Sequence, residues 1–283
     1  MKSILFPTDF SKASLNAFDY ALKYAEKIQV KLIVYHCFMP GAEIDEETQA
    51  IYEKVDIENF RSKKDKFPPF EKLIDKLYSD REGVKVKYVV EEGQFIETLK
   101  AYVQRKEDKI ELVMMGTQAI KMGMFDVFMK TNTSVILEQI NKPVIAIPER
   151  ASFDGDINNI VFLVDYKEDE KGPLAQIVKI CEEFEAKLHV LHFDLAHGES
   201  IVPLMDRFKE SLHFNGTEDN VHFQSIDTIN LKASLADYCK TNNIDMVCLV
   251  NHKRNFYQRL FSFSLTQDLL RSIDVPIMAI YNE

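Results

Sequence analysis

Short apolar runs alternate with longer stretches of helical periodicity along this chain. In the first half the apolar runs lie at 4–6, 31–36, 110–114 and 143–147. They are rich in Val, Ile and Leu, which is typical of strands that are buried on both faces. Strands of this kind that alternate with helices predict a parallel sheet with helices on both of its faces.

The stretches between these runs repeat apolar residues at three and four positions, as amphipathic helices do. Ser11 is a predicted N-cap, because its hydroxyl can accept a hydrogen bond from the first helical turn. The apolar positions of three predicted helices are Leu15, Phe18, Leu22 and Ala25; Phe95, Leu99 and Tyr102; and Leu231, Leu235 and Tyr238. Each half of the chain then follows the order β-α-β-α-β-α-β-α-β.

The second half of the chain repeats the first. Residues 4–9 match residues 160–165, and residues 31–36 match residues 187–192, in both cases 156 positions apart. Each segment of the first pair is an apolar run that ends in an aspartate, Asp9 in the first copy and Asp165 in the second. Two segments that keep one separation indicate an internal duplication.

The later strands keep the repeat at a shorter separation. Residues 110–114 match 244–248 at 134 positions, and residues 143–147 match 276–280 at 133 positions. The first copy therefore carries about 22 extra residues. Most of them fall in the stretch 40–80, which we interpret as a helical excursion on the surface.

The boundary between the copies falls near residues 149–156. Pro148, Gly155 and several charged residues interrupt the apolar pattern there. We therefore predict two α/β domains, at 1–150 and 156–283, each built on a five-stranded parallel sheet.

Composition narrows the function classes. The 283 residues carry a formal net charge of −10, which argues against a nucleic-acid partner because phosphate binding depends on clustered Lys and Arg. No stretch reaches the about 18 apolar residues of a membrane span, and no leader pattern is present, so we expect a cytoplasmic protein with no membrane partner. The four cysteines show no C-x-x-C spacing, which gives no indication of a metal or redox site. We expect Cys37 and Cys248 to be buried.

Candidate chemistry gathers at predicted strand ends. Asp9 ends the first strand, and its carboxylate can accept hydrogen bonds from ribose hydroxyls or an amine. Gly116 ends the fourth strand, where a missing Cβ lets a ligand approach the backbone. Thr131 and Asn132 begin the next helix, whose backbone N–H groups suit an anion. In an open parallel sheet these carboxyl ends form the ligand-binding edge.

These residues resemble a known family. The opening Pro7-Thr8-Asp9-Phe10-Ser11, the stretch from Gly116 to Thr131 and the closing strand 143–147 are similar to those of universal stress protein domains. The resemblance covers both copies, as in a tandem universal stress protein. It implies two Rossmann-like domains of the adenine nucleotide α-hydrolase type and a stress-response protein that binds ATP or AMP.

The resemblance also implies the ligand-binding residues of the first copy. The backbone near Cys37 would hold the adenine, Asp9 and Gly116 the ribose, and the remaining loop residues the phosphates. The full predicted set is Pro7, Asp9, Cys37, Met115, Gly116, Gln118, Ala119, Lys130, Thr131 and Asn132. The sequence departs from the family's ATP-binding pattern at Ala119 and Lys130, where the pattern has glycines. Lys130 either fills the pocket or offers its charge to a phosphate.

The second copy departs further from the pattern. Val250 stands where the first copy has Gly116, Lys253 stands at Ala119, and Phe263-Ser264 stand at Lys130-Thr131. A β-branched side chain at the close-approach position would push a ribose away, so we predict a degenerate nucleotide loop. Asp165 is the one ligand feature kept there.

The pattern of histidines indicates structural roles and no metal site. His36 and His192 recur at equivalent positions, which indicates a shared structural role. His189, His192 and Asp194 suggest a metal site, but residues 189 and 192 point to opposite faces of a strand. We therefore predict no metal.

Two functions remain open at this stage. The first is a signalling module that binds an adenine nucleotide, and the second is a protein with vestigial pockets that acts only through a protein partner. We predict no enzyme activity, because the chain has neither a P-loop nor a nucleophile elbow. Each copy ends in a short apolar strand, 144–147 and 277–281, so we expect the copies to pair as an intrachain pseudo-dimer. A further homodimer is compatible with this, and the protein partner is unidentified.

Overall fold

The chain folds into two compact units, Met1–Gly155 and Asp156–Glu283. The computed structural model describes residues 2–38, 84–117, 136, 139–195, 201–212, 220–251 and 273–281. The predicted excursion at 40–80 lies outside the described residues. The two units are described separately below.

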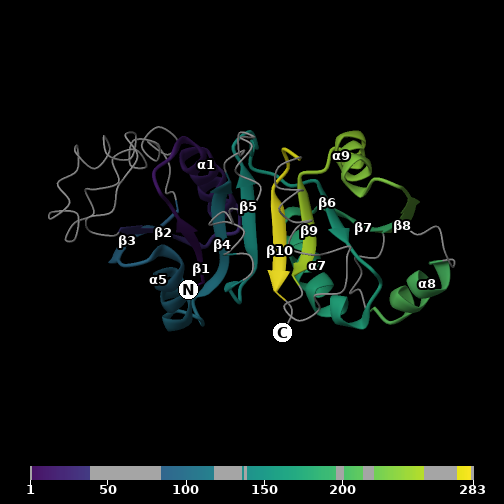
Figure 1. Cartoon of the computed structure of the whole chain (residues 1–283), viewed down its shortest axis with the longest axis horizontal. Helices are drawn as coiled ribbons and strands as arrows, with labels where there is room; N and C mark the ends of the chain where they lie inside the picture. Colours follow the sequence, from purple (N-terminus) through teal and green to yellow (C-terminus); the bar gives the residue numbers. More distant parts are fainter. Residues whose placement is uncertain are drawn as a thin grey trace. The chain divides into compact units, whose positions relative to one another are not determined.

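Unit 1 (Met1–Gly155) contains a parallel sheet in the order β3-β2-β1-β4-β5. Helices α1 and α5 lie on different sides of these strands (Figure 1). The strands are β1 (Ser3–Pro7), β2 (Lys31–Phe38), β3 (Val86–Glu92), β4 (Ile110–Thr117) and β5 (Val144–Pro148), and the helices are α1 (Lys12–Lys27) and α5 (Phe95–Arg105).

Unit 2 (Asp156–Glu283) repeats this order as β10-β9-β6-β7-β8, again with parallel neighbours. Its strands are β6 (Asn159–Leu163), β7 (Lys187–Asp194), β8 (Val221–Asp227), β9 (Met246–Asn251) and β10 (Ile277–Tyr281). Its helices are η3 (Glu168–Glu170), α7 (Lys171–Phe184), α8 (Val202–Glu210) and α9 (Leu231–Thr241). The predicted fold of two α/β copies, each with a five-stranded parallel sheet, is confirmed. Their pairing as a pseudo-dimer stays a prediction.

Of the two helices described in unit 1, α1 contains more buried residues. Ser11 caps it as predicted, since its hydroxyl accepts from the backbone N–H of Ser14 at 3.2 Å. Phe18, Leu22 and Ala25 of the predicted face are buried, whereas Leu15 is only half-buried. Further residues bury the helix on a second side as well: Ala13, Ala17, Tyr20, Ala21 and Tyr24.

The second buried side of α1 is covered by the segment that follows β5. Phe153 stacks on the ring of Tyr20 with centroids 4.4 Å apart. The side chains of Asn16 and Lys23 donate to the backbone carbonyls of Ala151 and Phe153, at 2.9 and 3.0 Å. The residues around the predicted boundary are therefore packed onto unit 1 as part of its core.

Candidate functional site

The carboxyl ends of β1 and β4 form the topological switch point of unit 1. The chain leaves β1 toward β2 and β3 on one side and returns to β4 on the other, so the connections diverge at this edge. Ligands of open parallel sheets bind at such a point. The structure brings five predicted residues to this edge: Pro7, Asp9, Cys37, Met115 and Gly116. The other five predicted residues lie outside the described residues: Gln118, Ala119, Lys130, Thr131 and Asn132.

A hydrogen-bonded turn links β1 to α1 and presents Asp9. Thr8 N–H donates to the carbonyl of Tyr35 at 2.9 Å, which ties the turn to β2. The hydroxyls of Thr8 and Ser14 lie 2.6 Å apart in a buried hydrogen bond. Asp9 itself is exposed, and its Oδ1 accepts from Ser11 N–H at 3.0 Å. The backbone therefore fixes the position of an aspartate whose side chain reaches solvent.

Phe10 gives this turn its shape. Its φ is 65°, in the left-handed region, where a non-glycine residue costs about 1–2 kcal/mol. Its side chain is buried and its ring centroid lies 4.6 Å from that of His36. Because the aromatic ring is pulled into the core, the preceding Asp9 is turned toward solvent.

His36, on β2, forms a hydrogen bond to the backbone of the same turn. Its Nδ1 lies 2.8 Å from the Thr8 carbonyl oxygen, so Nδ1–H donates to that oxygen. Burial lowers the pKa of the His36 imidazole, which keeps the ring neutral at physiological pH. His36 therefore supports the backbone of the turn and is not placed as a catalytic base.

Unit 2 contains the same supporting arrangement. His192 Nδ1 lies 2.8 Å from the carbonyl oxygen of Val164, and Val164 N–H donates to Leu191 at 3.0 Å. Tyr166 has a φ of 57° and packs on His192 with centroids 5.6 Å apart. The shared structural role predicted for His36 and His192 is confirmed. The positive φ that follows each strand-end aspartate was missed, since Phe and Tyr give no sequence signal for it.

Gly116 meets a structural requirement of its own. A Cβ placed on it would lie 2.8 Å from the carbonyl oxygen of Ala13 and 3.2 Å from the Cβ of Ala17, both on α1. The missing side chain thus lets α1 pack closely on β4. Sequence reasoning assigned this glycine to ligand approach alone, although the small residues Ala13 and Ala17 one turn apart could have indicated a close helix contact. Met115 is buried, so it would offer a ligand only its backbone.

Cys37 is only partly buried, contrary to the expectation of a buried thiol. Its Sγ lies 3.1 Å from the carbonyl oxygen of Gly93 and 3.2 Å from Oγ1 of Thr98. Burial raises the pKa of the Cys37 thiol above its usual value. The thiol is therefore a protonated hydrogen-bond donor at the end of β2.

At the corresponding edge of unit 2, the aspartate equivalent to Asp9 is paired with a lysine of the same unit. Asp165 has a side chain only 11% exposed, and Lys167 Nζ lies 2.5 Å from its Oδ2. Val250, at the position equivalent to Gly116, is buried. The degenerate nucleotide loop of the second copy stays a prediction. Lys253, Phe263 and Ser264 lie outside the described residues.

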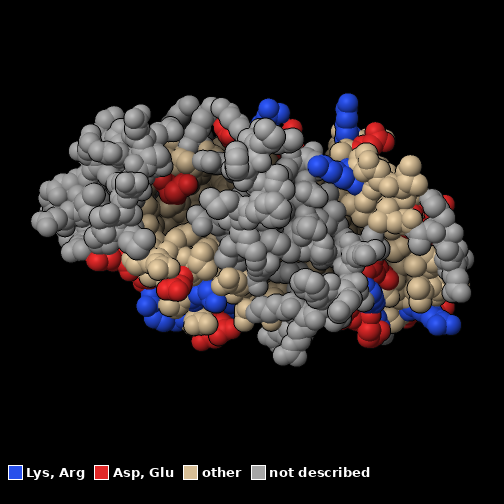
Figure 2. Space-filling model, viewed as in Figure 1, with Lys and Arg blue, Asp and Glu red and all other residues tan. Residues whose placement is uncertain are grey.

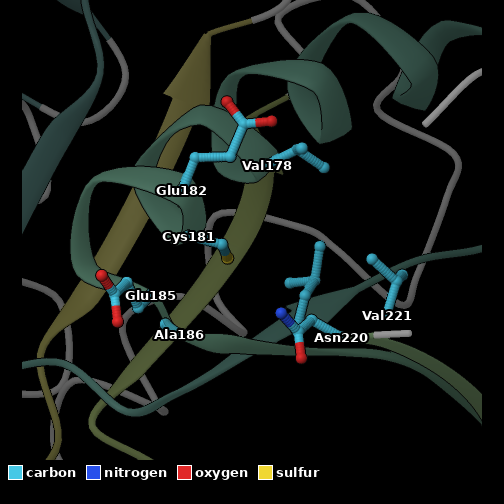
Figure 3. A pocket seen from close by; sticks show the side chains of 8 residues that line it. Val178, Cys181, Glu182, Glu185, Ala186, Asn220 and Val221 are labelled. Carbon is cyan, nitrogen blue, oxygen red and sulfur yellow. The ribbon is translucent and has the colours of Figure 1, made fainter. Parts of the chain in front are cut away.

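A separate pocket of about 470 Å³ lies in unit 2, between the end of α7 and the first residues of β7 and β8 (Figure 3). The Cys181 thiol points toward its interior, and burial raises the pKa of that thiol to about 12, which makes it a poor nucleophile. The lining residues are Val178, Cys181, Glu182, Glu185, Ala186, Leu188, Asn220 and Val221. They stand at the amino ends of the strands, so none of the predicted nucleotide residues takes part.

The described residues bear on three other kinds of partner: a metal ion, a membrane and a nucleic acid. They contain no group of three or more His, Cys, Asp or Glu placed to hold a metal. Within the same residues, no helix is both long and apolar enough to cross a membrane. On the face in view in Figure 2, Lys and Arg occur in small groups interspersed with Asp and Glu. The described residues in this view therefore form no continuous basic patch of the kind typical of nucleic-acid binding.

Solved structures share this architecture. A universal stress protein from Archaeoglobus fulgidus DSM 4304 is similar at 15% identity with a TM-score of 0.67, over 99% of this chain and 96% of the other. A putative universal stress protein from Pseudomonas aeruginosa UCBPP-PA14 is similar at 12% identity with a TM-score of 0.57, over 100% and 94%. The cytoplasmic domain of a prokaryotic cation chloride cotransporter is similar at 12% identity with a TM-score of 0.54, over 98% and 94%. At these identities the likeness establishes the fold alone.

Sequence comparison identifies the family. No curated protein matches the chain significantly. The profile of the universal stress protein family matches it twice, at residues 1–148 and 156–280. The two matches coincide with the two copies that the internal repeat indicated. The chain belongs to the universal stress protein family and carries two of its domains in tandem.

Proposed function

We propose that unit 1 binds an adenine nucleotide, ATP or AMP, and acts as a regulatory binding module in the stress response, without enzymatic turnover. The observation that carries this proposal is the exposed Asp9 carboxylate at the switch point between β1 and β4. Its position is fixed by the Ser11 N–H and by the buried Phe10 ring. A fixed, solvent-facing carboxylate at this edge is suited to a ligand with adjacent hydroxyls.

Each part of the nucleotide would meet a different strand end of unit 1. The Asp9 carboxylate would accept hydrogen bonds from the ribose hydroxyls, each a charge-assisted bond. The backbone near Cys37, on the neighbouring strand β2, would meet the base. The phosphates would be held by the predicted residues Gln118, Ala119, Lys130, Thr131 and Asn132, with Lys130 as a compact cation.

The second candidate function is a protein-binding role with closed pockets. It is favoured by the departures at Ala119 and Lys130 and by the state of unit 2, where Lys167 engages Asp165. For unit 2 we adopt this reading. On either reading we expect the protein to act in the cytoplasm and to signal through a protein partner. The two copies would pair within one chain, and a further homodimer would double the molar mass measured by light scattering.

The aspartates of the two copies provide a matched test. We would titrate the full chain with ATP, AMP and GTP by isothermal calorimetry and repeat the titration with Asp9→Asn and Asp165→Asn. Loss of charge-assisted bonds at Asp9 should weaken binding about 10- to 100-fold, since such bonds contribute about 1.5–3 kcal/mol each. Asp165→Asn should leave the affinity unchanged. Absence of binding at millimolar nucleotide, or equal losses in both variants, would refute the proposal.

A further inference from the structure

The turn between β6 and α7 buries a carboxylate. Glu170 is only 1% exposed. Its two carboxylate oxygens accept from the backbone N–H of Asp165 at 3.0 and 3.1 Å, and its Oε2 also accepts from Lys167 N–H at 2.8 Å. In unit 1 the equivalent position is Ser14, whose hydroxyl bonds to Thr8. Unit 2 thus builds the same turn around a buried acid in place of a neutral hydroxyl.

A second carboxylate belongs to the same turn and is incompletely paired. Asp165 Oδ2 accepts from the Lys167 ammonium. Its Oδ1 is buried and has no hydrogen-bond partner within the described part of the chain. His192 Nδ1 is 3.8 Å from this Oδ1, but the proton on that nitrogen is used by the carbonyl of Val164. The turn therefore holds a buried acceptor to which none of these donors is directed.

The charges of the turn do not balance when both acids are ionised. Asp165 and Glu170 supply two negative charges, and among the described residues Lys167 supplies the one positive charge for which an ion pair with this turn is found. Burial raises the pKa of Glu170 to about 7, and the Asp165 charge acts in the same direction. The backbone N–H donors and Lys167 act against this rise without cancelling it. Tyr166 faces the turn too, and its ring lies against His192.

We propose that the buried Glu170 carboxyl binds and releases a proton, so that unit 2 responds to pH through its β6–α7 turn. With one proton bound, the two acids carry a single negative charge, which the Lys167 ammonium balances. The proton also adds a hydrogen-bond donor to a turn that contains the unpaired Oδ1 of Asp165. Loss of that proton leaves one uncompensated buried negative charge.

The site links protonation to stability with a defined sign. Glu170 has a higher pKa in the folded chain, about 7, than its ordinary 4.5, so between these values the folded state binds more protons than the unfolded state. The stability from this proton is complete below about pH 4.5 and is lost as the pH rises through about 7. The folding equilibrium of unit 2 should fall on the order of 100-fold across this interval.

The proton can be observed directly by carbon NMR of the carboxyl groups in the full chain, labelled at Glu and Asp. In the wild type we expect one carboxyl to titrate near pH 7. Glu170→Gln should remove this titration, whereas Glu168→Gln, an exposed neighbour in the same turn, should retain it. Urea unfolding of unit 2 as a function of pH should show the same difference between the two variants.

Two further variants keep the proposal testable if Glu170→Gln fails to fold. Lys167→Met removes the cation and should move the midpoint to higher pH. Asp165→Asn removes the neighbouring charge and should move it to lower pH. The proposal is overturned if no carboxyl titrates between about pH 6 and 8, if both variants shift the midpoint in the same direction, or if His192→Gln alone abolishes the transition.

Discussion

Replacement of Gly116 by alanine would test how closely α1 and β4 pack. The added Cβ would lie 2.8 Å from the Ala13 carbonyl oxygen and 3.0 Å from its carbon. These are backbone atoms, which cannot rotate away as a flexible side chain would. Helix α1 would have to move outward by some tenths of an ångström, carrying the Asp9 turn with it.

The magnitude follows from two opposing effects. Overpacking of a well-filled core costs about 1–3 kcal/mol. The reduced freedom of the unfolded chain on changing Gly to Ala returns about 0.4–1 kcal/mol. We therefore expect Gly116→Ala to lower the free energy of unfolding of unit 1 by about 1–2 kcal/mol.

Urea unfolding followed by circular dichroism would measure this loss. Gly172→Ala is the control, because a Cβ at Gly172 would meet nothing within 4 Å. Pro173 disfavours the helical conformation of a preceding residue that carries a Cβ, so alanine at position 172 has little to gain there. We therefore expect the free energy of unfolding to change by no more than about 0.5 kcal/mol in Gly172→Ala. A Gly116→Ala protein as stable as the wild type would show that the contact with Ala13 does not govern this position.

The remaining predictions concern the covered side of α1 and the thiols. Phe153→Ala should destabilise unit 1 by about 2–4 kcal/mol, because the ring is buried against Tyr20; an unchanged urea midpoint would contradict the docking of this segment. Among the thiols, Cys37 should react first with a disulfide reagent in the native chain, since it alone is partly exposed, while burial raises the pKa of Cys181 and Cys239 to about 12. Faster modification of Cys181 or Cys239, read by peptide mass mapping, would contradict their burial.

The sequence predicted features that repeat or alternate. The constant separation of 156 positions between matched strands indicated the duplication. The predicted strand ends placed Asp9 and Gly116 at one edge of the sheet. These features follow from local apolar patterns and from the rule that parallel strands share their carboxyl edge. The same information predicted the cap at Ser11, which depends on neighbours in sequence.

The features that sequence reasoning missed depend on residues distant in the chain. The docking of Phe153 on Tyr20 joins segments separated by more than a hundred positions. Burial of Glu170 was not foreseen, since a charged run in a turn is normally solvated. Nothing in the local pattern shows that its carboxylate finds backbone N–H donors within the turn.

The comparison of the two turns separates a folding requirement from a ligand requirement. Both copies keep a left-handed aromatic residue, Phe10 or Tyr166, and a histidine that donates to a backbone carbonyl. Unit 2 keeps this costly conformation although Lys167 occupies its aspartate, so the conformation serves the fold and is no sign of a ligand. The copies differ in whether the aspartate is exposed. The case for a nucleotide in unit 1 therefore depends on the solvent-facing Asp9 carboxylate, which is why the paired aspartate variants discriminate between the two functions.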